Sequence, residues 1–222
     1  MQPKTLSLIE KLILLLIVMI LALGFYFFNT NVPRFETYVQ EDGVVEWLTV
    51  LGLILGSVTC FYRLFILRKQ RKPWFLFVVF IMGLGLFFAA GEEISWGQRI
   101  FHIQSSEFFL KNNAQGETNL HNLVVGGLKV NKIVFSIGLV AAMGLYLVFF
   151  PLIYKRSASF KRFVDKSGIP IPFAYQVISI LVVFALTEMI RHGKRAELLE
   201  AGIALLFFLI IYRPVNKEIF SK

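Results

Sequence analysis

The sequence predicts an all-α fold: a polytopic membrane helix bundle with about six transmembrane helices, forming one domain over residues 1–222. Three observations predict this class. The chain is 57% hydrophobic with a mean hydropathy of +0.70, whereas about half of a soluble domain is apolar. Charged residues make up only 17% of the chain, against about a quarter in soluble domains. Six continuous apolar runs approach the roughly 20 residues that a helix needs to cross the hydrocarbon layer.

The apolar runs place the spans at about 8–28, 45–66, 74–94, 132–154, 170–190 and 196–213, with an outer polar loop at about 95–131. The first run follows Lys4, as in a signal peptide, but it is too long and lacks an A-x-A site, so we interpret it as a retained span. The third and fifth runs begin beside Pro73 and Pro170, because a missing N–H costs nothing in a first helical turn. In the second run, Gly52 and Gly56 have GxxxG spacing, which fits either close helix contact or ordinary glycine usage in membranes.

Basic residues cluster between the second and third runs and between the fourth and fifth. The positive-inside rule places both loops in the cytoplasm, and an even number of spans then places both termini there. That side holds 15 of the 23 basic residues and three of the 14 acids. We therefore expect a multi-pass protein of a bacterial inner membrane. Its net charge of +9 fits anionic lipid head groups as partners, and we find no nucleic-acid-binding motif.

The opposite face collects most of the acids and all three histidines. The 11 acids are Glu36, Glu41, Asp42, Glu46, Glu92, Glu93, Glu107, Glu117, Glu188, Glu197 and Glu200. Carboxylates at the membrane boundary are costly and usually face the bundle interior. We therefore expect a polar pocket that opens to the outer face, with Glu46 among its substrate-binding residues.

The stretch GEEISWGQR, residues 91–99, ends the third predicted span. If the helix continues through it, Glu92, Trp96 and Arg99 lie on one stripe and Glu93 is rotated by about 100°. We predict that Glu92 and Glu93 are catalytic acids or bases, because intramembrane carboxylates are functional by default. Arg99 and Trp96 are candidate substrate-binding residues. The alternatives are an ion pair between Arg99 and a glutamate, and an interfacial position for Trp96.

A second polar stretch, NAQGETNLHNL, covers residues 113–123 and follows an amphipathic segment at 100–110. Glu117 and His121 have i, i+4 spacing, so one helical turn would place them side by side as a base and its orienting partner. The alternative is a short helix capped by Thr118 or Asn119. We predict a catalytic role for His121 and a substrate-binding role for Asn119.

The third polar stretch, TEMIRHGKRAELLEAG, covers residues 187–202. Glu188, Arg191 and His192 share one helix face, and Glu197 and Glu200 share another. These groups form either a structural ion network or a site for an anionic group. We predict His192 as catalytic and Arg191 as an anion holder, with the three glutamates as supporting residues.

A divalent metal such as zinc is a candidate cofactor. Three ligands, His121, His192 and Glu93, with one open position would lower the pKa of a bound water to about 7. The spacing of these residues in the sequence is not diagnostic of such a site.

Two resemblances follow from these stretches. The combination of GEEISWGQR and GETNLHN resembles uncharacterised bacterial inner-membrane proteins, which implies no activity. The adjacent glutamates also resemble the first motif, EExxxR, of the CAAX-processing and bacteriocin-processing membrane protease family, which implies an intramembrane protease. Here the spacing to Arg99 is EExxxxxR, and the family's later FxxxH and HxxxN motifs are not found in order.

The leading functional hypothesis is a hydrolase or transferase that acts on a lipid or lipid-linked substrate by acid–base or metal-assisted chemistry. The sequence contains no GxSxG, HExxH or P-loop motif that would supply another chemistry. The alternatives are an ion- or proton-coupled transporter or channel, and a structural or assembly subunit. A transporter needs polar residues deep in the bundle, and the spans contain few of them.

Overall fold

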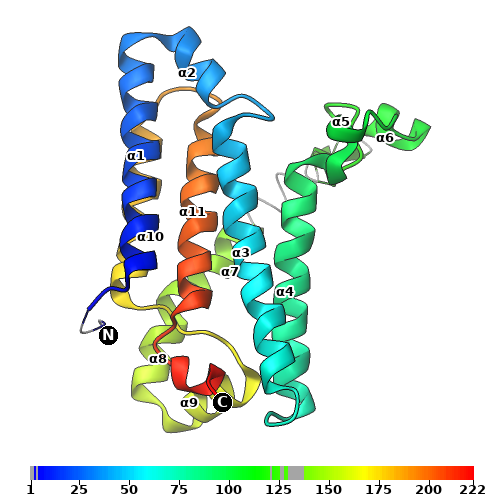
Figure 1. Ribbon diagram of the computed structural model, residues 1–222. Helices are drawn as coiled ribbons and strands as arrows, with labels where there is room; N and C mark the ends of the chain where they lie inside the picture. Colours follow the sequence, from blue (N-terminus) through cyan, green and yellow to red (C-terminus); the bar gives the residue numbers. More distant parts are fainter. Residues whose placement is uncertain (1–2, 4, 121, 126–127, 130–137) are drawn as a thin grey trace.

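The computed structural model describes residues 3, 5–120, 122–125, 128–129 and 138–222. Its long helices run side by side along the axis of a bundle (Figure 1): α1 (Leu8–Thr30), α3 (Val44–Leu67), α4 (Pro73–Glu93), α10 (Ala174–Met189) and α11 (Arg195–Tyr212). α11 is central, because α1, α3 and α10 all pack on it, whereas α4 packs on the outer side of α3. The predicted all-helical architecture is therefore confirmed.

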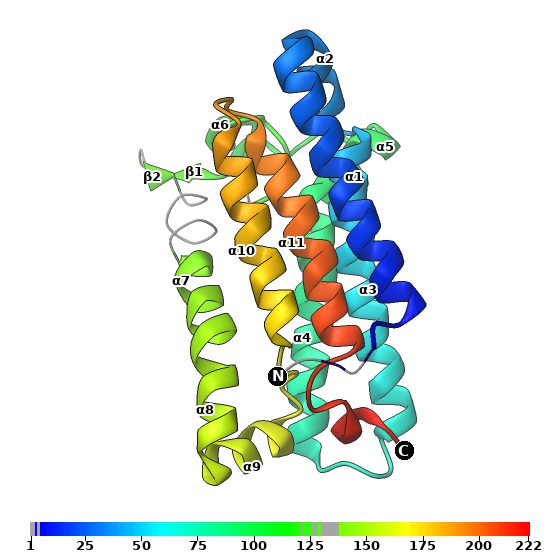
Figure 2. The same ribbon diagram turned by 90° about the vertical axis from the view of Figure 1, so that its left-hand side faces the viewer.

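A second rod of helix flanks α10 (Figure 2). It consists of α7 (Leu139–Gly144), the π-helical turn η3 (Leu145–Phe149) and α8 (Phe150–Arg156). The chain then turns through α9 (Ala158–Ser167) beneath the bundle, and the last short helix, η4 (Lys217–Phe220), lies at the same end. The predicted span at 132–154 begins outside the described residues, and its described part continues as helix to Arg156.

The remaining elements are short and lie at the other end of the bundle. They are α2 (Val32–Tyr38), η1 (Ser95–Gly97), α5 (Gln98–Phe101), α6 (Glu107–Asn112), and the antiparallel pair β1 (Val124–Val125) and β2 (Leu128–Lys129). Figure 1 shows α2, α5 and α6 at this end and both termini at the opposite end. The loops that the sequence assigns to one face therefore do gather at one end of the bundle.

Three helices within the described part of the chain are long and apolar enough to cross a membrane: α1, α3 and α4. Their bounds agree with the predicted spans to within two residues. α10 is shorter, with 16 residues. α11 has 18 residues and carries Arg195, Glu197 and Glu200 in its first two turns, so its charged beginning separates it from the other three.

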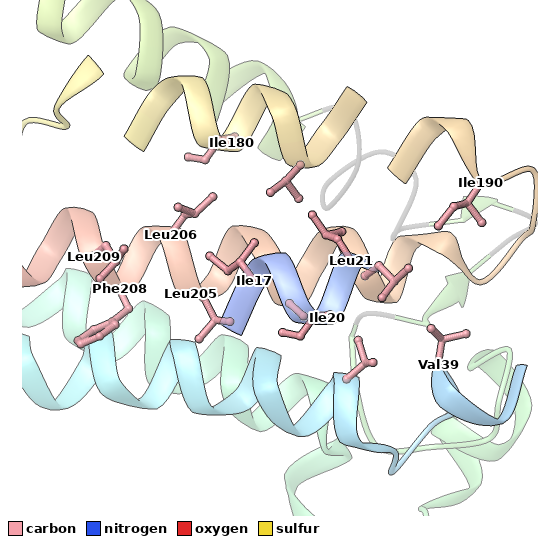
Figure 3. Packing of buried hydrophobic residues seen from close by; sticks show 14 of the residues in the cluster. Ile17, Ile20, Leu21, Val39, Ile180, Ile190, Leu205, Leu206, Phe208 and Leu209 are labelled. Carbon is pink, nitrogen blue, oxygen red and sulfur yellow. The ribbon is translucent and has the colours of Figure 1, made fainter. Parts of the chain in front are cut away.

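An apolar core fills the middle of the bundle around α11. Leu205, Leu206 and Leu209 of α11 meet Ile17 and Ile20 of α1, with Ile180 of α10 on the other side (Figure 3). Gly52 lets α3 approach this helix closely, because a Cβ there would lie 2.7 Å from the backbone carbon of Ala204. The close-contact interpretation of Gly52 is thus supported. The core separates the polar end described below from the end that holds the termini.

Candidate functional site

The chain reverses sharply where α4 ends, and this turn creates the site. Ser95, Trp96 and Gly97 take up successive left-handed conformations, with φ of 46°, 56° and 76°. The helix therefore does not continue through this stretch, and the helical stripe of Glu92, Trp96 and Arg99, which depends on that condition, does not form. The turn folds the Trp96 ring back over Gly91, where an added Cβ would lie 2.8 Å from the ring. A glycine is needed at position 91 because the indole occupies the space of its side chain.

Glu92 fastens this turn. Its side chain is buried, with 5% exposure, and it accepts hydrogen bonds from Trp96 Nε1 at 2.8 Å and from the Leu120 backbone N–H at 2.5 Å. These bonds tie the end of α4 to the loop at 113–122. Within this arrangement Glu92 is an acceptor that holds structure in place.

Arg99 joins three carboxylates that come from two separate parts of the chain. Its guanidinium nitrogens lie 2.8 Å from Asp42, Glu46 and Glu117. Burial alone would lower the pKa of Arg99, but its hydrogen bonds to Glu117 and the nearby negative charges outweigh burial and raise that pKa. Arg99 therefore stays protonated and neutralises part of the acidic end.

Amide side chains hold Glu117 in position. Asn119 donates to Ser95 Oγ at 2.8 Å, and the Ser95 hydroxyl donates to Glu117. Asn113 donates to both the backbone and the side-chain oxygen of Asn119 at 2.9 Å, and its own oxygen accepts from the Glu117 N–H at 3.2 Å. Residues 117–120 form an irregular, hydrogen-bonded loop and not the beginning of the helical turn that would place Glu117 beside His121, which lies outside the described residues. The loop's side-chain bonds replace those that a helix would supply.

These parts enclose a cavity of about 80 Å³ at the end of the bundle. It is lined by Glu41, Glu46, Glu92, Glu93, Arg99, Gln115, Glu117, Asn119, Asn122, Glu197 and Glu200. A single water needs about 10–15 Å³ on this kind of measure, so the space suits a few waters or one small polar group. Seven of these residues are glutamates and one is a cation, which makes the cavity strongly acidic.

Three of the lining glutamates differ from the rest. Within the described residues, the side-chain carboxylates of Glu93, Glu197 and Glu200 form no hydrogen bond or ion pair. Glu93 ends α4, and the other two lie one turn apart on α11, so the cavity brings two helices together at this cluster. Each other glutamate that lines the cavity has a polar partner.

The structure thus gathers most of the predicted site residues: Glu46, Glu92, Glu93, Arg99, Glu117, Asn119, Glu197 and Glu200 all line one cavity. Trp96 lies beside it as the partner of Glu92. Gln115, Asn122 and Glu41 were not predicted as site residues, although the amide-rich composition of residues 113–122 was visible in the sequence. Gln115 links this loop to Glu41, to which its amide donates.

Three predicted residues of the third stretch, Glu188, Arg191 and His192, lie apart from the lining. His192 Nε2 lies 3.1 Å from Glu36, and its ring packs against Phe35. Glu188 pairs with Arg195 at 3.1 Å, and Arg191 is exposed. His121 lies outside the described residues. Among the residues that the structure describes, no group of three His, Cys, Asp or Glu side chains has the arrangement of a metal site.

No family model, no curated protein and no solved structure matches this chain.

Proposed function

We propose that this chain is an integral membrane enzyme, a hydrolase or transferase, that acts on a lipid or lipid-linked substrate at the acidic end of the bundle. Glu93 is the proposed acid–base residue. It would take a proton from water or from a hydroxyl nucleophile as that group attacks the substrate, and return a proton to the leaving group.

The observation that carries the proposal is the unpartnered state of Glu93 in a motif whose other polar residues are all engaged. Glu92, Ser95, Gln98 and Arg99 each make hydrogen bonds that hold the turn or the loop. A carboxylate that exchanges protons must be reachable by its substrate and free of a fixed cation. Glu93 meets both conditions, because it faces the cavity and no described cation contacts it.

The charges of the cavity favour one class of substrate group. Arg99, the one cation among the residues that line the cavity, is engaged by three carboxylates, and Arg191 lies apart from the lining, so the lining offers no free cation to hold a phosphate. Neutral hydroxyl or amide groups and cationic amines complement the seven glutamates instead. We therefore assign Arg99 a structural role and expect the reacting group of the substrate to be neutral or cationic.

The proposal includes a topology. We infer six spans, in which α10, α11 and the rod that ends in α8 join the three long apolar helices. The basic loops beside α9 and at 68–72 would face the cytoplasm together with the termini. The acidic cavity would then open at the outer face of a bacterial inner membrane.

Glu93→Gln tests the enzyme directly. Membranes from cells that produce the wild type, Glu93→Gln or Glu107→Gln at matched levels would be compared by lipid mass spectrometry with membranes that lack the protein. Glu107 is a matched control, because it is exposed on α6 at the same end and does not line the cavity. We expect a change in at least one lipid class with the wild type and Glu107→Gln, and none with Glu93→Gln.

An identical lipid profile with and without the wild-type protein would remove the enzyme proposal. The same comparison is then made with purified protein in vesicles, which contain the total polar lipids of the cells used for expression and no other enzyme. If Glu93→Gln produces the same change in the lipid profile as the wild type, Glu93 is not the acid–base residue, but the proposal that the protein is an enzyme stands.

Ion or proton transport is the second candidate, and the three unpartnered carboxylates favour it. A transport path must continue beyond the cavity, however, and below Glu200 the α11 helix buries Leu205, Leu206, Leu209 and Ile210 in the apolar core. Proton or cation flux in proteoliposomes that Glu200→Gln abolishes would reverse this ranking.

A further inference from the structure

The segment that follows the turn carries an apolar surface with no described partner. Ile100, Phe101, Ile103, Phe108 and Leu110 are each at least half exposed. None belongs to the hydrophobic clusters found among the described residues. We call residues 98–112, which include α5 and α6, the arm.

The arm is amphipathic in three dimensions. Its polar side faces the site: Gln98 donates to Ser105 Oγ at 2.6 Å and accepts from the Thr118 N–H at 2.7 Å, and Arg99 reaches the carboxylates. Its apolar side chains are left on the outside of these contacts. The polar bonds fix the arm against the bundle end, so the apolar side cannot turn inward without breaking them.

The position of the arm indicates what covers this apolar side. The arm begins five residues after the end of α4, one of the helices long enough to cross a membrane. Figure 1 shows α5 and α6 projecting sideways just beyond that helix end. An element at this level lies in the head-group region of the bilayer, about where amphipathic segments insert their apolar faces.

Trp96, which precedes the arm, packs on the apolar surface of α4. The Trp96 ring, 43% exposed, packs against Phe87 and Phe88, which are themselves exposed on the outer surface of α4. Aromatic residues of this kind concentrate at the membrane–water boundary. Trp96 therefore extends the exposed apolar surface of α4 to within two residues of the arm.

We propose that the arm is an interfacial membrane anchor whose apolar side chains insert into the lipid leaflet beside the acidic cavity. Phe101 and Phe108 are the two principal inserted residues. The anchor holds the cavity rim at the lipid surface, and it does so whatever reaction the site performs.

The test uses the full chain in lipid vesicles. Cys60 is buried and is the single cysteine, so Cys60→Ala provides a background for cysteines introduced one at a time. Phe101→Cys and Phe108→Cys would be labelled with a polarity-sensitive fluorophore and reconstituted into vesicles with or without bromine atoms on the lipid chains. Val58→Cys, exposed in the middle of α3, is the lipid control, and Ala114→Cys, exposed in the polar loop, is the water control.

We expect brominated lipid to quench the labels at 101 and 108, with blue-shifted emission, as at 58, while the label at 114 is quenched by aqueous iodide. If either arm position behaves like 114, the anchor is refuted. Failure of lipid quenching at 58 as well would refute the membrane position of α3 on which the anchor depends. Size-exclusion chromatography before reconstitution confirms that each variant is folded.

Discussion

Arg99 Nη1 lies 2.8 Å from both carboxylate oxygens of Glu117, so one ion pair joins the turn after α4 to the loop at 113–122. Nη2 of the same guanidinium reaches Glu46 at the start of α3, also at 2.8 Å. Arg99 therefore connects three segments that are distant in the sequence. The geometry of the acidic cavity depends on this connection.

Arg99→Gln should destabilise the protein. Its removal leaves Glu46, with 4% exposure, and Glu117 without their cation. We expect a loss of about 3 kcal/mol in the free energy of unfolding, the lower end of the cost of breaking a buried ion pair, because Arg99 is itself partly exposed. Denaturant unfolding in detergent micelles, followed by circular dichroism, measures it.

Arg195→Gln is the matched control for this experiment. Arg195 pairs with Glu188 at 3.1 Å at the same end, but both side chains are exposed. Exposed pairs contribute about 0–1 kcal/mol. Equal losses for the two variants would contradict a central role for Arg99.

Glu93→Gln and Glu117→Gln should separate function from stability. Glu93 has no described partner, and its charge is close to those of Glu197 and Glu46. Its neutralisation should therefore leave the free energy of unfolding unchanged within about 0.5 kcal/mol, or increase it. Glu117→Gln removes the charge that pairs with Arg99 and should cost about 1–3 kcal/mol.

The same unfolding measurement tests both variants. A large loss for Glu93→Gln would mean that this carboxylate holds structure, and the functional argument for it would fail. A stable Glu117→Gln would instead show that the amide network positions the loop without the ion pair.

Gly91→Ala should disturb the turn, because the new methyl group would meet the Trp96 ring at 2.8 Å. The ring must move, and its hydrogen bond to Glu92 is then lost. We expect a destabilisation of about 1–3 kcal/mol from overpacking, together with a red shift in tryptophan emission.

Gly85→Ala in the same helix is the control, because no described atom of another element lies within 4 Å of the position that its new methyl group would take. Alanine has the higher helix propensity, so this variant should be neutral or more stable by up to about 1 kcal/mol. Its tryptophan emission should match that of the wild type. The same emission shift in both variants would show that the Trp96 ring does not lie over Gly91.

The sequence predicts the helices better than the site. The bounds of α1, α3 and α4 follow from continuous apolar runs, and the gathering of acids at one end follows from their loops. The turn at Ser95–Gly97 was missed because left-handed φ values at a serine and a tryptophan have no reliable sequence signal. That turn determines which carboxylates lie within reach of Arg99. The helical stripe of Glu92, Trp96 and Arg99 therefore could not predict the ion pairs that Arg99 forms.

The different contacts of Glu92 and Glu93 also could not be predicted from the sequence. Adjacent glutamates look equivalent in the motif, and only the contacts separate them. Glu92 accepts the Trp96 and Leu120 N–H groups, whereas Glu93 faces the cavity. Similarly, the spacing around His192 gave no indication that Glu36, from a segment far along the chain, is its partner.

Gly52→Ala should separate α3 from α11. Its methyl group would lie 2.7 Å from the backbone carbon of Ala204, and backbone cannot yield by changing a rotamer. One helix must therefore shift, and we expect a loss of about 1–3 kcal/mol in the free energy of unfolding. Because Glu46 lies on α3 and Glu200 on α11, the shift should also alter the cavity.

Gly56→Ala, one turn further along α3, is the matched control. Its methyl group would meet only the side-chain ends of Leu86 and Ile211, at 3.2 and 3.3 Å. These flexible ends can move by the few tenths of an ångström required, so Gly56→Ala should cost less than Gly52→Ala in the same denaturant experiment. The reverse order would mean that backbone contact at Gly52 does not set the distance between α3 and α11.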